Sequence, residues 1–118
     1  RVPVKLEQYL EKLNASPEAI TFNDTMSVIA EHYDYTPTTF TNGDATNPAG
    51  TNEGSCKLFA FAKLNSLSEE KTLQAFGDYY RVDVLQNPDG TDHANIRNFM
   101  ITGWHGVEFE GTALEESC

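Results

Sequence analysis

The stretch AGTNEGSCKLFAFAKL, from Ala49 to Leu64, decides how this chain folds, because a polar, glycine-containing loop leads directly into an almost wholly apolar segment. After Ser55 only Lys57 and Lys63 are strongly polar. A helix that is apolar on nearly every side is typical of the buried interior of a protein. We therefore predict a central, buried helix that begins at Ser55.

The other helices are predicted from apolar spacing and capping signals. Leucines recur at helical spacing near the start of the chain, Ser16-Pro17 is a start signal, and Ser66 with Glu69 forms a capping box. We expect helices over 4–14, from 16 to about 33, from 66 to 77, over 78–86, and from a cap at Thr91 or Asp92 to about Thr102.

Two segments favour β-strands. Thr38–Thr41 is rich in β-branched residues, and Val107–Glu110 alternates apolar and acidic residues. An isolated strand has no partner for its backbone, so we expect these two to pair. The predicted fold class is α+β: one mostly helical domain over residues 1–118, with a small two-stranded antiparallel sheet and a frayed acidic tail over 111–118.

Charge excludes two classes of partner. The 118 residues carry 8 basic and 18 acidic side chains, for a net charge of −10. Such a surface repels phosphate backbones and anionic lipids, so we expect no nucleic acid and no membrane as partners. The two cysteines, Cys56 and Cys118, do not form a disulfide framework.

Five strings resemble one family when they are taken together, in this order and at this spacing. They are FNDTMSVIAEHYDYTPTTFTNG, GTNEGSCKLFAFAKL, TLQAFGDYYRVDVL, NPDGTDHANIRNFM and GWHGVEFEG. They resemble the HopJ family, named for type III effector proteins of plant-pathogenic bacteria and also found in marine bacteria and algae. The resemblance implies a small single domain that is cytoplasmic in a bacterium and could be delivered into a host. The loop insert DATNPAG and the tail TALEESC depart from the bacterial pattern and fit a plastid protein if the source is an alga.

One candidate site is catalytic. Cys56 lies at a helix start, where free N–H groups lower a thiol pKa and could form an oxyanion hole. His93 and Asn95 follow in the order of thiol hydrolases, with Cys56 as nucleophile and His93 as base. The alternative is that Cys56 is a small buried apolar residue on a central helix.

The second candidate is a ligand or partner surface made of Tyr80, Arg81, Asp92, His93, Arg97 and Trp104. Its alternative is a purely structural network, in which Asp78 or Asp83 pairs with Arg81 and Asp92 pairs with Arg97. For Trp104 we expect burial against Phe40, Phe99 and Phe109.

Metal and cofactor sites are not expected. Asp89, Asp92 and His93 could ligate a divalent ion, with His105 or Glu53, but a turn followed by an aspartate cap explains them without metal. The glycine-rich loop lacks the order of a phosphate-binding loop. The sequence therefore favours an interaction module that acts by protein or small-ligand contact, without cofactor or metal. The alternative is the Cys56 hydrolase, so enzyme activity is left open with a leaning against it.

Overall fold

The computed structural model describes residues 6–116. In chain order its elements are α1 (Leu6–Ala15), the 3₁₀ turn η1 (Pro17–Ala19), α2 (Phe22–His32), β1 (Tyr33–Tyr35), β2 (Phe40–Asn42), β3 (Ala45–Asn47), α3 (Glu53–Leu64), α4 (Glu69–Gln74), the π-helix η2 (Tyr79–Val84), α5 (Ala94–Thr102), the 3₁₀ turn η3 (Gly103–Gly106), β4 (Val107–Phe109) and β5 (Leu114–Glu116). The predicted α+β class, mostly helical with a small antiparallel sheet, is confirmed.

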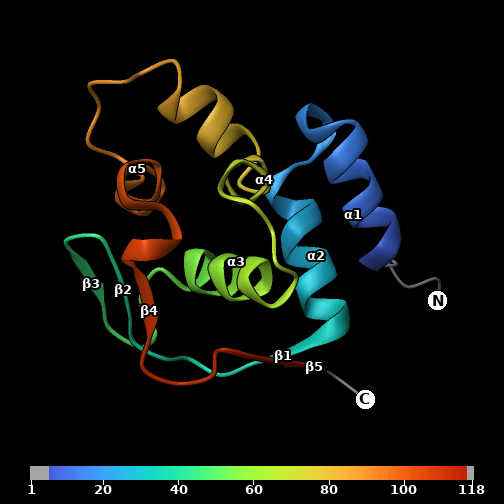
Figure 1. Cartoon of the computed structure of the whole chain (residues 1–118), viewed down its shortest axis with the longest axis horizontal. Helices are drawn as coiled ribbons and strands as arrows, with labels where there is room; N and C mark the ends of the chain where they lie inside the picture. The colour runs from blue at the N-terminus through green and yellow to red at the C-terminus, as the bar shows by residue number, and fades with distance from the viewer. Residues whose placement is uncertain (1–5, 117–118) are drawn as a thin grey trace.

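Helix α3 lies at the centre of the molecule, with α2 and α5 on either side of it, β2, β3 and β4 to its left, and β1 and β5 below it (Figure 1). Phe59 and Phe61 are fully buried. The Phe59 ring contacts those of Phe76 and Phe99, with centroids 5.4 and 5.0 Å apart. Large buried rings contribute much of the hydrophobic stabilisation of a small core. The predicted central helix is confirmed, and it begins at Glu53, slightly earlier than expected.

The main sheet has three strands in the order β3–β2–β4, all antiparallel. The predicted pairing of the two β-prone segments is confirmed, with Phe40 opposite Phe109. Their rings stack at 5.5 Å. The expectation of only two strands was wrong, because β3 forms inside DATNPAG, the predicted loop insert.

A second ladder joins β1 to β5, with Tyr35 opposite Leu114. The prediction of a frayed tail was therefore wrong for 111–116, while 117–118 lie outside the described residues. Ala113 and Leu114 are buried, and Thr36 N–H donates to the Ala113 carbonyl. Burial of these two apolar side chains, together with the ladder, holds the acidic strand in place.

Helix starts differ from the predicted ones in two places. Ser16-Pro17 opens only the short turn η1, and α2 begins after Thr21, which forms a capping box with Asp24. Helix α4 is capped by Ser68, whose hydroxyl accepts from Lys71 N–H, rather than by Ser66. The expected helix over 4–14 is α1, and its positions 4 and 5 lie outside the described residues.

Gly77 ends the α4 region in a left-handed conformation, with φ of +65°. A Cβ at this position would lie 2.7 Å from the Phe22 nitrogen, so only glycine allows this close approach to α2. The chain then enters η2. Among residues 6–116, none of the helices has the length and apolar character needed to cross a membrane.

Candidate functional site

A pocket of about 470 Å³ lies where α3 and α5 begin. One part of its wall is apolar, with Phe22, Phe76 and Ile96, and another part is polar. The remaining lining residues are Ala45, Asn47, Asn52, Gly54, Ser55, Tyr79, His93, Ala94 and Asn95. A mostly preformed cavity with a few convergent polar groups is the usual form of a small-molecule site.

Both helix starts present backbone donors at this pocket. Asn52 and His93 are the N-cap residues of α3 and α5, and neither side chain caps its helix. The first N–H groups of a helix have no acceptor within the helix and carry partial positive charge. Those of Gly54 and Ser55 on α3, and of Ala94 and Asn95 on α5, belong to residues that line the cavity. The pocket is therefore rich in hydrogen-bond donors.

The two N-cap residues also share an uncommon backbone conformation. Asn52 has φ of 48° and His93 has φ of 52°, both in the left-handed region. Non-glycine residues held there cost free energy, and they cluster at ligand sites and active sites. The same conformation at both helix starts sets the positions of the Asn52 and His93 side chains at the rim of the pocket.

A group of asparagine side chains holds the two helix starts together. Asn95 Oδ1 accepts from the Nδ2 groups of Asn42 and Asn47, each at 3.1 Å. Asn95 Nδ2 donates to Asn47 Oδ1 at 3.1 Å, and Asn52 Nδ2 donates to the same oxygen at 2.7 Å. Asn42, Asn47 and Asn95 are buried. Because β2, β3 and α5 each supply one member, this network fixes the pocket wall to both the sheet and the helix.

His93 lies between two carboxylates at the pocket. Its Nε2 is 3.0 Å from Asp83 Oδ2 and 3.8 Å from Asp92 Oδ2. The ring packs against Tyr79, with centroids 5.1 Å apart. With Nε2 turned to Asp83, Nδ1 is the ring nitrogen that remains available to a ligand.

Arg97 holds the loop before α5. It donates to Asp92 Oδ1 at 2.6 Å and to the Asn87 carbonyl at 2.9 Å. The hydrogen bond from Arg97 lowers the pKa of the Asp92 carboxyl, and the charge of Arg97 adds to the shift. The predicted Asp92–Arg97 pair is confirmed.

Within residues 6–116, Asp83, Asp92 and His93 form the group best placed to ligate a metal, since their ligand atoms lie within 4.8 Å of one another. Carboxylate and imidazole ligands suit several divalent ions. However, Arg97 already binds Asp92, and the guanidinium charge opposes a cation there. Asp89, which the sequence grouped with Asp92 and His93, is not part of this set.

Cys56 does not meet His93. Cys56 is 1% exposed, and its thiol lies 3.9 Å from the Thr38 carbonyl and is not part of the pocket lining. Burial raises the pKa of this thiol, so the expected lowering by the helix start was wrong. The predicted burial of Cys56 is confirmed. Asn95, the third member of the proposed catalytic group, is engaged with the other asparagines.

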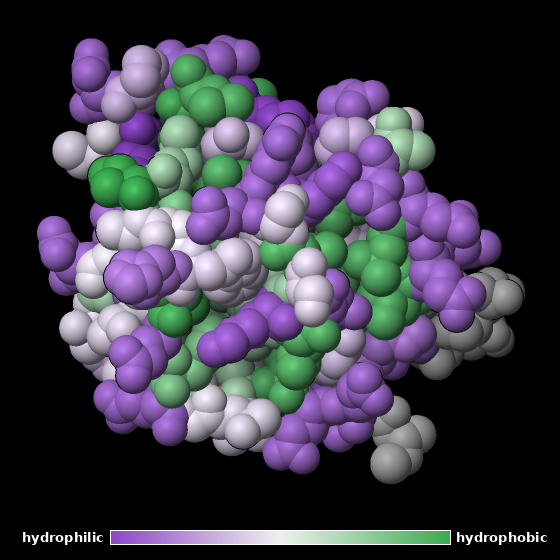
Figure 2. Space-filling model, in the orientation of Figure 1, coloured by the Kyte–Doolittle hydropathy of each residue, from purple (hydrophilic) through white to green (hydrophobic). Residues whose placement is uncertain are grey.

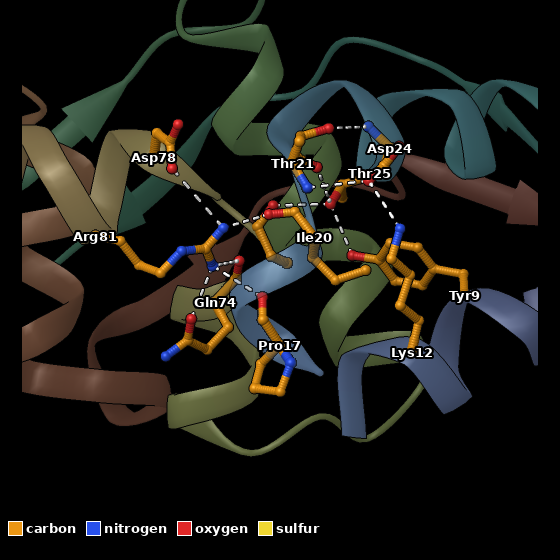
Figure 3. Close-up of polar contacts among 11 residues, drawn as sticks. Tyr9, Lys12, Pro17, Ile20, Thr21, Asp24, Thr25, Gln74, Asp78 and Arg81 are labelled. Carbon is orange, nitrogen blue, oxygen red and sulfur yellow. Dashed lines mark hydrogen bonds and ion pairs between the residues drawn. The ribbon is translucent and has the colours of Figure 1, made fainter. Parts of the chain in front are cut away.

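Arg81 points into the body of the molecule (Figure 3). It donates to the Pro17 carbonyl at 3.0 Å, to Gln74 Oε1 at 2.8 Å and to the Ile20 carbonyl. Asp78, one of its two expected partners, is 4.0 Å away, while Asp83 pairs with His93 instead. Arg81 therefore links η2 to η1 and α4, and backbone carbonyls rather than carboxylates are its main acceptors.

Tyr80 and Trp104 also lie apart from the pocket. Tyr80 is partly buried against the core. Trp104 is half-buried, and its indole Nε1 donates to the Leu67 carbonyl at 3.0 Å. Its ring contacts Phe99 as expected, but the other neighbour is Phe59. Of the predicted surface, the structure brings together Asp92, His93 and Arg97.

Several lining residues were missed from sequence. Asn47 and Asn52 were not singled out, because polar loops are commonly rich in asparagine, and Asp83 was expected beside Arg81 rather than beside His93. One signal was available: Asn42, Asn47 and Asn52 recur at equal spacing through a segment that contains Gly43, Gly50 and Gly54.

The fold and the pocket define a small α+β domain with a preformed cavity between two helix starts. The family model for the HopJ type III effector protein matches residues 6–114, so the chain belongs to the HopJ family. It is similar to the crystal structure of VPA0580, a protein of unknown function, at 52% identity and a TM-score of 0.97. That match covers 98% of this chain and 97% of the other. The search of curated proteins found no match.

Proposed function

We propose that this HopJ protein is a binding module whose ligand is a small polar molecule held in the pocket between α3 and α5. The observation that carries the proposal is the convergence of His93, Tyr79, Asn52 and the two helix starts on one cavity of about 470 Å³. A volume of this order fits a metabolite or a short peptide end.

The lining suggests the chemistry of the ligand. Backbone N–H groups and the Asn52 and Tyr79 side chains favour a ligand with hydrogen-bond acceptors at one end. Phe22, Phe76 and Ile96 favour an apolar or ring-shaped part at the other.

For the biological setting, the family supports an effector role. The matching model describes type III effector proteins, and we extend this to a protein made in a bacterium and delivered into a host cell. In that setting the pocket would bind a host metabolite. A translocation reporter fused to the chain tests this, with a secretion-deficient strain as the control that gives no signal.

The test of the pocket itself is a thermal-shift screen of small polar metabolites. Ala94→Trp fills the pocket from an exposed position at the start of α5, and Ala30→Trp places the same side chain on the exposed side of α2. We expect the wild type and Ala30→Trp to be stabilised by the same compounds and Ala94→Trp to lose the effect. Equal stabilisation of all three would refute binding in this pocket.

A further inference from the structure

Large hydrophobic side chains are exposed together on one face of the molecule. Within residues 6–116, the exposed large hydrophobics are Leu64, Tyr79, Val82, Leu85, Met100 and Ile101. All except Leu64 belong to η2, to the residue that follows it, or to α5. We name Val82, Leu85, Met100 and Ile101 the η2–α5 face. Figure 2 shows hydrophobic side chains at the surface over η2 and α5, toward the upper left.

This face is hollowed. A groove of about 370 Å³ runs between η2 and α5 and is separate from the polar pocket. Its lining is mainly apolar, with Val84, Leu85, Pro88, Met100 and Ile101, and Gly90 and Arg97 complete it. Ile101, one of these lining residues, is 81% exposed. Exposed apolar side chains that gather around a groove mark an interaction site more often than scattered ones do.

The local charge decides what kind of partner fits. Residues 78–102 contain Asp78, Asp83, Asp89 and Asp92 against two arginines and no lysine. Both arginines already donate hydrogen bonds within the chain. Arg81 donates to the Pro17 carbonyl of η1, and Arg97 donates to the Asp92 carboxylate. Asp89 is exposed and lies between Pro88 and Gly90, which both line the groove. Because Arg97 binds Asp92 and His93 pairs with Asp83, Asp89 is the carboxylate that makes the rim of the groove acidic, on a chain whose net charge is −10.

Charge also disfavours the other occupants of an apolar groove. A second copy of this chain would bring another net charge of −10 toward the acidic rim. Anionic lipid is repelled for the same reason. A segment with positive side chains gains attraction at the rim, while its apolar side chains enter the groove.

We infer that the η2–α5 face docks a basic amphipathic segment of a partner protein, with aliphatic or aromatic side chains in the groove and Lys or Arg beside Asp89. A helix in a hydrophobic groove is a common form of peptide recognition, with apolar contacts about one turn apart. This surface is distinct from the ligand pocket and would let the chain bind a protein and a small molecule together.

The test is selection from a displayed library of random short peptides against the purified chain. We expect enriched peptides to carry net positive charge with Leu, Ile, Met or Phe at helical spacing. Binding of an enriched peptide, measured by fluorescence anisotropy, should fall at least about tenfold in Ile101→Ser, as for a central interface residue. Leu64→Ser is the control: it removes an exposed leucine at the last position of α3, which does not line the groove. This variant should bind the peptide like the wild type.

Four results would overturn the inference. These are no enrichment, enrichment of acidic or uncharged peptides, equal binding by Ile101→Ser, and self-association of the wild type in sedimentation equilibrium that Ile101→Ser abolishes. The last result would assign the face to a second copy of the chain. Both variants alter exposed side chains, so circular dichroism should confirm that each keeps its fold.

Discussion

Replacing Asn95 with alanine would test whether the asparagine network holds the pocket together. Asn95 makes side-chain hydrogen bonds with Asn42 and with Asn47, the latter in both directions, each at 3.1 Å. A buried hydrogen bond contributes a net of about 1 kcal/mol, so the three together correspond to about 3 kcal/mol. Since the free energy of unfolding of a small domain is about 5–15 kcal/mol, Asn95→Ala should lose a large share of the stability.

Guanidinium denaturation followed by far-UV circular dichroism measures this loss. Asn98→Ala serves as the matched control on the same helix, because Asn98 makes one side-chain bond to the sheet, to the Asn42 carbonyl at 3.1 Å. We expect it to cost about 1 kcal/mol. If Asn95→Ala cost no more than Asn98→Ala, the network would not be stabilising and the reasoning about the pocket wall would be refuted.

Three further predictions concern the core. Cys56 should react with iodoacetamide far more slowly in the native protein than after unfolding, because burial raises its pKa; labelling at the rate of a free thiol would contradict this. Burial raises the pKa of Tyr9 to about 12, so the stability that it contributes is fully present below pH 10 and is lost as the pH rises toward 12. The stability advantage of the wild type over Tyr9→Phe should shrink over that range in denaturant melts, and a constant difference would argue against it. Trp104→Ala should cost about 3–5 kcal/mol through lost contacts with Phe59 and Phe99, and a loss under about 1 kcal/mol in the same melts would show a surface tryptophan.

Local pattern was sufficient for the centre of the fold. The apolar run after Ser55 identified α3, and period-two alternation identified β4 and its pairing with β2. Strands β3 and β5 were missed because their own residues carry little β signal. Asn47 is held by a buried amide network, and Glu115 and Glu116 are exposed beside the buried Leu114. What stabilises these strands is contact with distant segments, which sequence spacing does not reveal.

The same limit applies to the pocket. Asp92, His93 and Arg97 could be grouped because they are neighbours in the chain. Asp83 reaches His93 only because η2 and the turn after it fold back toward α5. The hypothesis that His93 acts as the base for Cys56 is not supported by the geometry. Ser55 lines the pocket beside His93, but Cys56, the next residue along α3, is buried and is not part of the lining.

The most direct test of the ligand pocket is a two-dimensional ¹H–¹⁵N NMR titration of the labelled protein with pooled small polar metabolites. The account predicts that a binding compound shifts the amide signals of Gly54, Ser55 and Asn95, while the signal of Ile101 on the η2–α5 face stays in place. Binding compounds that leave the first three signals unchanged, or pools that shift no signal at all, would contradict it.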